Sequence, residues 1–186
     1  KALMRIRGEE PIPGEPADEK VLKEMIDAPL GDRTQWRPRW PKLEEYTVPI
    51  GKGKICREGT DLTVVSYGRT LPLCVQSADA MKADGISAEV IDLRSLWPYD
   101  WTMISESIRK TRKVLFVNED TEVTNFGEHL ARRATEEFFY ELDAPPRVLA
   151  GEHLPGIGLA DALENASVPQ RASIEAAMRE VHSLQP

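Results

Sequence analysis

TDLTVVSYG (residues 60–68), SAEVIDLR (87–94) and KVLFVNED (113–120) are three strings rich in β-forming residues, and each is followed by a segment with the apolar spacing of a helix. This alternation is typical of βαβ units around a parallel sheet. A fourth short string, RVLA (147–150), follows a Pro-Pro break. Because parallel strands are joined by right-handed crossovers, we expect an α/β fold: an open, doubly wound, mostly parallel sheet of about four to five strands with helices on both faces.

Apolar residues at helical spacing predict one helix after each of these four strands, the last beginning near residues 167–169. Gly85 is expected to end the first helix, and Asp100 to cap the start of the second. Asn125 and Glu128 have the spacing of a capping box at the start of the third. The residues expected to face the core are Leu71, Val75, Ala78 and Met81, then Trp101, Ile104 and Ile108, then Phe126, Leu130, Ala134 and Phe138, and finally Ile174, Ala177 and Val181.

Residues 1–46 differ in composition from the α/β domain that we expect over residues 47–186. Six prolines and three glycines interrupt this segment too often for a long regular element, which predicts an irregular Pro-rich linker or arm. One short helix is expected from Asp18 to about Ile26, where apolar residues form a stripe and Asp18 can act as the cap. Trp36 and Trp40 indicate that the arm lies on a surface, which belongs either to this same domain or to something else.

Charge and cysteine content restrict the class of protein. The 186 residues carry a formal net charge of −7, which argues against nucleic-acid or anionic-membrane binding and suits a basic protein partner. No apolar run is long enough to span a bilayer. Cys56 and Cys74 form no CxxC motif, and we interpret them as reduced thiols of an intracellular protein.

The sequence offers no catalytic constellation. No stretch pairs a nucleophile with a base, and His129, His153 and His182 have no second potential ligand at i+3 or i+4. Glu119 and Asp120 end a predicted strand, where open α/β sheets often bind ligands, but the next loop lacks a glycine-rich turn and we expect these carboxylates to be solvated. We therefore expect no catalytic, cofactor-binding or metal-binding residue in this chain.

An aromatic cluster formed by Trp97, Pro98, Tyr99 and Trp101 precedes the second predicted helix. Two interpretations stay open, because such a cluster can cap the sheet edge within one domain or can form a subunit contact. The candidate interface consists of these four residues together with Phe126 and Gly127 at the start of the third helix.

Three longer strings resemble a known family when they are taken in order: EEYTVPIGKGKICREGTDLTVVSYGRTL (44–71), GISAEVIDLRSLWPYD (85–100) and RKTRKVLFVNEDTEVTNFGEHLARRATEEFF (109–139). They are similar to the C-terminal domain of the transketolase superfamily, and within it to the β subunit of E1, the thiamine-diphosphate-dependent 2-oxo acid dehydrogenase component. The opening KALMR (1–5) resembles the end of the preceding pyrimidine-binding domain. Two departures are a longer connector and Thr124-Asn125 in place of a usual glycine pair.

The resemblance implies a fragment of an enzyme that is inactive alone. In such enzymes thiamine diphosphate and Mg lie between two other domains, so this chain is expected to bind neither. The parent reaction would be oxidative decarboxylation of a 2-oxo acid with acyl transfer to lipoyl-E2. The C-terminal domain contributes to association, so the implied partners are the E1 α subunit or an α-like domain, a second β copy in a dimer, and the E2 acyltransferase of a multienzyme complex. The implied location is the cytoplasm, or the mitochondrial matrix in a eukaryote.

Two alternatives remain. One is the same domain from a transketolase or a deoxyxylulose phosphate synthase, which the strings YTVPIGK and DLRSLWPYD make less favoured. The other is a stand-alone small-ligand-binding α/β domain. A pyrimidine-domain signature encoded upstream would favour the E1 interpretation over this last one.

Overall fold

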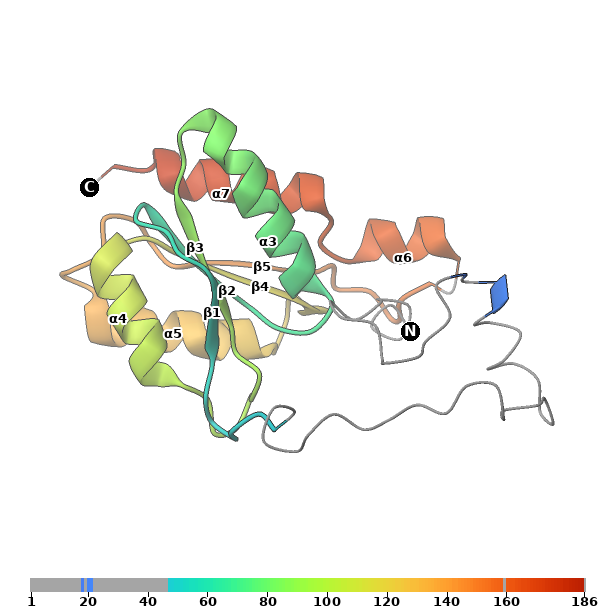
Figure 1. The fold of residues 1–186 in the computed structure, drawn as a ribbon, viewed down its shortest axis with the longest axis horizontal. Helices are drawn as coiled ribbons and strands as arrows, with labels where there is room; N and C mark the ends of the chain where they lie inside the picture. The colour runs from blue at the N-terminus through green and yellow to red at the C-terminus, as the bar shows by residue number, and fades with distance from the viewer. Residues whose placement is uncertain (1–17, 19, 22–46, 159, 186) are drawn as a thin grey trace. The chain divides into compact units, whose positions relative to one another are not determined.

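Five strands form one sheet in the order β1-β3-β2-β4-β5 (Figure 1). The computed structural model describes residues 18, 20–21, 47–158 and 160–185. Strands β2 to β5 are parallel to one another, and β1 pairs with β3 in the antiparallel direction. The strands are Lys54–Arg57 (β1), Leu62–Ser66 (β2), Ala88–Asp92 (β3), Val114–Thr121 (β4) and Arg147–Gly151 (β5).

Helices cover both faces of this sheet, which confirms the predicted α/β class. Helices α3 and α7 lie on one face, and α4 and α5 lie on the other (Figure 1). The helices are α3 (Thr70–Met81, continued by the 3-10 turn η2, Lys82–Asp84), α4 (Trp101–Thr111), α5 (Phe126–Phe138), α6 (Asp161–Ser167) and α7 (Arg171–Ser183).

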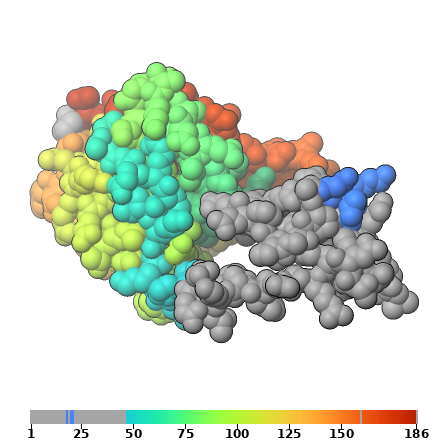
Figure 2. Space-filling view, viewed as in Figure 1, coloured from blue at the N-terminus to red at the C-terminus, as the bar shows by residue number. Residues whose placement is uncertain are grey.

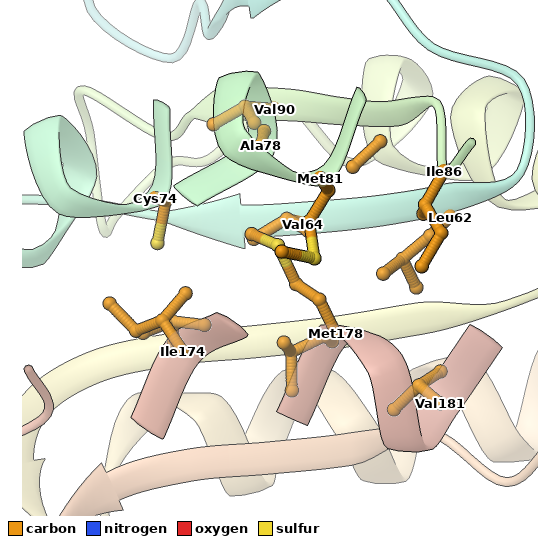
Figure 3. Packing of buried hydrophobic residues seen from close by; sticks show 13 residues of the cluster. Leu62, Val64, Cys74, Ala78, Met81, Ile86, Val90, Ile174, Met178 and Val181 are labelled. Atoms are coloured by element: carbon orange, nitrogen blue, oxygen red, sulfur yellow. The ribbon is translucent and has the colours of Figure 1, made fainter. Parts of the chain in front are cut away.

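Neighbouring residues of the central strand β2 point to opposite faces and fill two separate cores. Val64 packs with the buried side chains of α3 and α7 (Figure 3), and Val65 packs with those of α4 and α5. Strands covered on both faces are rich in apolar residues, which is why β2 and the first four residues of β4 stood out in the sequence. The predicted inward residues Leu130 and Ala134 of α5 are both buried, so the predicted phase of this helix is confirmed.

The helix caps also agree with the sequence, with one change. Asp100 Oδ1 accepts from the Met103 N–H, and Gly85 takes the left-handed conformation (φ 76°) at the end of η2. Asn125 Oδ1 accepts from the Glu128 N–H at 3.2 Å. In a capping box the Glu128 carboxylate would accept from the N–H of the cap, Asn125. Here it accepts instead from the Thr124 N–H at 2.6 Å, one residue before the cap.

Two elements were not predicted. Strand β1 is not among the strands expected from the sequence; its four residues, which include Cys56, form a strand because they pair with β3. Helix α6 was also missed, because its seven residues carry no apolar stripe and Leu163 is exposed. Strand β4 runs four residues further than the predicted Val114–Val117.

Contacts divide the chain into two units, Lys1–Val48 and Pro49–Pro186, and each is described by itself. In the first unit the Asp18 carboxylate accepts from the Lys20 N–H at 2.8 Å, as the predicted cap requires, and residues 20–21 are helical. The rest of the helix predicted up to Ile26 lies outside the described residues, as do Trp36 and Trp40.

Candidate functional site

Five segments meet at the carboxyl edge of the sheet. The loops after β2, β3, β4 and β5 lie there because these strands are parallel. Residues 49–53 also lie there, because β1 runs in the opposite direction and its first residue, Lys54, pairs with Asp92 at the end of β3. This is the edge at which open α/β sheets present their functional groups.

Tyr99 is the centre of an aromatic cluster at this edge. Its ring is 5.4 Å from that of Phe126, 6.1 Å from that of Trp101 and 6.1 Å from that of Trp97, measured between ring centroids. The contacts with Phe126 and Trp101 are edge-on, the arrangement that aromatic quadrupoles favour. The structure therefore brings together the aromatic residues that the sequence singled out in the β3–α4 loop and at the start of α5.

The Tyr99 hydroxyl is fixed by two hydrogen bonds. Arg133 Nη1 donates to it at 2.9 Å, and His129 Nε2 lies 2.8 Å away. A guanidinium can only donate, so the tyrosine oxygen accepts from Arg133. In the second hydrogen bond, the tautomer of the His129 ring sets which of the two atoms donates.

Arg133 also ties the cluster to the surface of α5. Its guanidinium carbon lies 4.2 Å from the Trp101 ring centroid, and its Nε donates to the Glu137 carboxylate at 2.7 Å. Trp101 Nε1 donates to the same carboxylate at 2.7 Å. The hydrogen bond from Arg133 is the main reason that the pKa of Glu137 is lowered from its ordinary value. The Tyr99 hydroxyl and Trp101 Nε1 are thus both hydrogen-bonded to side chains of α5 within the domain.

The outer part of this region is exposed. Trp97 is 81% exposed, and Ile50, which the sequence did not indicate, is 80% exposed. Their two loops are joined, because the Gly51 N–H donates to Ser95 Oγ at 3.0 Å and Lys52 Nζ lies 3.6 Å from the Asp100 carboxylate. Figure 2 shows the segment that leads into β1 (cyan) beside the segment that follows β3 (yellow-green). We call Ile50, Leu96, Trp97 and Pro98 the loop surface.

The predicted interface residues thus separate into two groups. Trp97 and Pro98 are exposed, whereas Tyr99, Trp101 and Phe126 are half-buried in contacts within the domain. Gly127 is buried, and a Cβ at this position would lie 2.7 Å from Asn118 Nδ2 and 2.8 Å from Asn125 Oδ1. The half-buried and buried members pack within one domain, and a subunit contact through Trp97 and Pro98 stays a prediction.

Asn118 and Asn125 form a hydrogen-bonded pair at the amino terminus of α5. Asn118 Nδ2 donates to Asn125 Oδ1 at 3.1 Å, and Asn125 Nδ2 donates to the Thr121 carbonyl at 2.8 Å. Asn118 Oδ1 accepts from the Asp120 N–H at 3.1 Å. With the bonds described above, the Glu128 N–H in the first turn and the Thr124 N–H just before the helix are both engaged by the chain itself.

Carboxylates gather on the opposite side of the same edge. The loop after β4 lies beside the end of β5, because the Glu122 N–H donates to the Gly151 carbonyl at 2.7 Å and Thr121 Oγ1 is 3.2 Å from His153 Nδ1. Two exposed apolar side chains, Val123 and Leu154, lie on these segments. We call the acidic edge the set made of Glu119, Asp120, Glu122 and Glu152 with Val123 and Leu154.

Burial and the carboxylates of the acidic edge raise the pKa of a tyrosine at the middle of the sheet edge. The pKa of Tyr67, in the turn after β2, is raised to about 12, first by burial and then by Asp120 and Glu119. Glu119 and Asp120 were expected to be solvated; Asp120 is exposed and Glu119 is half-buried.

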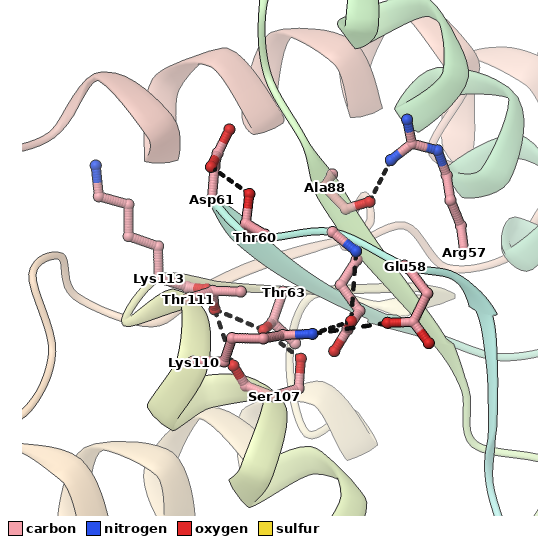
Figure 4. Close-up of polar contacts among 12 residues, drawn as sticks. Arg57, Glu58, Thr60, Asp61, Thr63, Ala88, Ser107, Lys110, Thr111 and Lys113 are labelled. Atoms are coloured by element: carbon pink, nitrogen blue, oxygen red, sulfur yellow. Dashed lines mark hydrogen bonds and ion pairs between the residues drawn. The ribbon is translucent and has the colours of Figure 1, made fainter.

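A second polar cluster lies at the amino edge of β2 and β3 (Figure 4). Buried Glu89 accepts from Lys110 Nζ and, at 3.4 Å, from the Gly59 N–H. Burial disfavours the charged form of Glu89, but hydrogen bonds from Lys110 and Ser107 outweigh it, and the pKa is lowered. Thr63 Oγ1 lies 2.6 Å from Ser107 Oγ and 2.7 Å from Thr111 Oγ1. Because its partners are other parts of the domain, we interpret this cluster as structural.

Across the described ranges, no three His, Cys, Asp or Glu side chains are placed to hold a metal ion. In the same part of the chain, no helix is long and apolar enough to cross a bilayer.

The strand order and the helices on both faces define an open α/β domain of the doubly wound class. The family model "Transketolase, C-terminal domain" matches residues 51–174, and the chain belongs to this family. It is 40% identical over 138 residues to the 2-oxoisovalerate dehydrogenase subunit beta of Bacillus subtilis, an alignment that covers 74% of this chain and 42% of that protein. It is 36% identical over 141 residues to the pyruvate dehydrogenase E1 component subunit beta of Rhizobium meliloti, covering 76% and 30%.

A solved structure supports the same fold. The chain superposes with a TM-score of 0.67 and 25% identity on a protein described as "Split gene transketolase, inactive beta4 tetramer", covering 81% of this chain and 49% of that one. The resemblance to E1 β subunits is therefore confirmed. The chain spans less than half the length of each of these relatives.

Proposed function

We propose that residues 47–186 are the association domain of the β subunit, or β-like portion, of a thiamine-diphosphate-dependent 2-oxo acid dehydrogenase E1 component. The parent enzyme would carry out oxidative decarboxylation of a 2-oxo acid with acyl transfer to lipoyl-E2. Residues 1–46 would be the arm that follows a pyrimidine-binding domain. The observation that carries the proposal is Trp97, whose indole is 81% exposed although the neighbouring Tyr99 is fixed by Arg133 and His129.

The described residues do not fit a bound thiamine diphosphate with Mg. At the start of α5 the Glu128 N–H already donates to Asn125 Oδ1, and the Glu128 carboxylate at the same terminus would repel a diphosphate. The acidic edge would also repel a diphosphate. The cofactor of the parent enzyme would accordingly be held by other domains, and no catalytic step is assigned to this chain.

The proposed partners are an E1 α subunit or α-like domain, a second β copy, and E2. The second copy has support from the relative that forms a tetramer of β chains. The proposed location is the cytoplasm, or the mitochondrial matrix if the source is a eukaryote, since the E1 β relatives of Dictyostelium and rice are named as mitochondrial.

One alternative function keeps a specific observation in its favour. The relative with a TM-score of 0.67 is a split-gene transketolase, which would make this chain the C-terminal domain of a sugar transketolase. The identity of 36–40% to E1 β subunits, against 25% to that protein, favours the 2-oxo acid dehydrogenase.

Sedimentation of the 186-residue chain over a concentration series, with and without Trp97→Ala, tests the association role. Loss of one central aromatic anchor costs about 2 kcal/mol or more in typical interfaces, so we expect the dissociation constant to rise about 30-fold. The matched control is Tyr140→Ala, which removes a 95% exposed aromatic at the end of α5. A chain that stays monomeric at high concentration, or one whose association depends on Tyr140 and not on Trp97, would contradict the proposal.

A further inference from the structure

The edge strand β1 is attached to the domain by few contacts. It lies at one end of the sheet and pairs with β3 alone. Of its four described residues none is buried, whereas all five residues of β2 are buried. Ile55 packs against the core on the α4–α5 side but is itself only partly buried. Removal of β1 would therefore leave every buried member of both cores in place.

A β-bulge at Cys56 turns the end of β1 toward the other face of the sheet. Ile55 is opposite Ile91 of β3. Arg57, two residues further along, is opposite Val90, which is only one residue away from Ile91. Residues directly opposite each other in an antiparallel pair lie on the same face, and Ile91 and Val90 belong to the cores on opposite faces. Ile55 therefore faces α4 and α5, whereas Arg57 faces α3.

Arg57 uses this direction to join β1 to two other elements. Its Nε donates to the Asp79 carboxylate of α3 at 2.9 Å, and its Nη1 donates to the Ala88 carbonyl at the start of β3 (Figure 4). The Arg57 side chain is only 9% exposed. Hydrogen bonds from an ionised donor are stronger than neutral ones, so this guanidinium is the main side-chain attachment of β1.

The two flanks of β1 are held unequally. Before the strand, the Gly51 N–H donates to Ser95 Oγ, and the exposed Lys52 ammonium is 3.6 Å from a carboxylate, a contact of a kind that contributes little. After the strand, a Cβ at Gly59 would lie 2.2 Å from the Ala88 carbonyl carbon, so this turn is packed tightly against β3. Movement of β1 would therefore take residues 49–53 with it and turn about residues 58–59.

We propose that residues 49–57 form a strap that opens from β3 as one unit, and that the Arg57 guanidinium is the clasp that keeps it closed. Opening exposes β1 and one edge of β3 and leaves both cores intact, so it requires far less free energy than unfolding of the domain. It also carries Ile50 away from Trp97. A partner that contacts both residues would bind the closed strap alone and stabilise it. This consequence rests on the proposed association function, whereas the strap itself does not.

The two cysteines of the chain report on the two kinds of opening. Cys56 lies on the strap, and Cys74 is completely buried on α3. Burial raises the pKa of both thiols, that of Cys74 to about 12, so each reacts slowly while it is covered. Labelling of the 186-residue chain with N-ethylmaleimide at low protein concentration, followed by mass spectrometry of the two peptides, gives one rate for each cysteine. We expect Cys56 to react at least about 100-fold faster than Cys74, with a rate that rises less steeply with urea.

Two substitutions separate opening of the strap from unfolding of the domain. Arg57→Met keeps the apolar stem but removes the clasp, and we expect Cys56 to react at least about 10-fold faster. Ile174→Val, in the core beside α3, weakens contacts that are lost only when the domain unfolds. It should raise the rate of Cys74 about 2- to 12-fold and leave that of Cys56 unchanged.

The matched control for loss of an arginine is Arg179→Met. Arg179 Nε donates to the Asp84 carboxylate at 2.8 Å and joins α7 to η2, away from the strap, so the rate of Cys56 should not change. Arg57→Lys is a second clasp variant, which keeps a positive charge near Asp79 and should give an intermediate rate. Circular dichroism establishes that each variant is folded.

Three results would contradict the inference. Equal rates for the two cysteines, both raised by Ile174→Val, would show that the domain opens as a single unit without a strap. A Cys56 rate that responds neither to urea nor to Arg57→Met would show that this thiol reacts without any opening. A Cys56 rate that rises with urea but not with Arg57→Met would overturn the role of the clasp. Because the labelled protein is dilute, these results do not depend on association, and failure of the association function appears separately in sedimentation.

Discussion

The two edges of the sheet use similar charged residues in different ways. At the amino edge, Glu89 is buried and its bonds go to Lys110, Ser107 and the backbone of Gly59, all within the domain. At the carboxyl edge, Asp120 is exposed and the Lys52 side chain is 67% exposed, and exposed apolar side chains lie beside them. The comparison separates two uses of charge: at the amino edge it is bonded within the domain, and at the carboxyl edge, where we propose association, it remains accessible.

The largest effect is expected at Gly59, where β1 turns toward β2. A Cβ at this position would lie 2.2 Å from the Ala88 carbonyl carbon and 2.2 Å from the Glu89 nitrogen, so Gly59→Ala forces backbone apart. We expect a loss of about 3 kcal/mol or more in the free energy of unfolding, measured by urea denaturation. The control is Gly156→Ala, whose Cβ would meet nothing within 4 Å. Equal stability of the two variants would show that the amino edge is less rigid than described.

An intermediate effect is expected at Glu89. Glu89→Gln weakens the bond with Lys110 and should cost about 1–3 kcal/mol at neutral pH. Because the folded-state pKa is lowered, this stabilisation is present above the ordinary glutamate value of 4.5 and is lost as pH falls through the folded-state pKa. Urea denaturation of both proteins from pH 7 down to pH 3 should show the difference between them shrinking with acid; a constant difference would contradict the ionised pair.

The smallest effect on stability is expected at Trp97. Its side chain is exposed, so Trp97→Ala should change the free energy of unfolding of the monomer by no more than about 0.5 kcal/mol. Trp101→Ala is the matched comparison, because Trp101 stacks on buried Phe138 with ring centroids 6.2 Å apart and should cost about 2 kcal/mol or more. Denaturation at concentrations below any association gives both values. A large loss from Trp97→Ala would assign this residue to the core.

Much of the fold was predictable because its signals are local. Strands β2 and β4 are covered on both faces, so β2 and the first four residues of β4 are rich in apolar residues, and α5 shows its phase through Leu130 and Ala134. Strand β1 was not predictable, because only its pairing with β3 makes it a strand. Helix α6 lacks the apolar stripe that would indicate a helix.

The candidate site divides in the same way. Trp97 and Tyr99 are adjacent in sequence and were found together. Ile50 joins them only because β1 is antiparallel, and Glu152 joins Glu122 only because β4 pairs with β5. Contacts between segments so far apart depend on strand order, which neither composition nor spacing encodes.

The capped amino terminus of α5 also affects the electrostatic potential at the carboxyl edge of the sheet. An α-helix carries about half a positive charge at its amino terminus, which would partly neutralise nearby carboxylates. Here Asn125 Oδ1 accepts from the Glu128 N–H of the first turn, and the Glu128 carboxylate accepts from the Thr124 N–H just before the helix, so one carboxylate already lies at this terminus to offset the dipole. Asp120 and Glu122 lie outside this capping motif, so the charge of the acidic edge depends in part on which carboxylate caps the neighbouring helix.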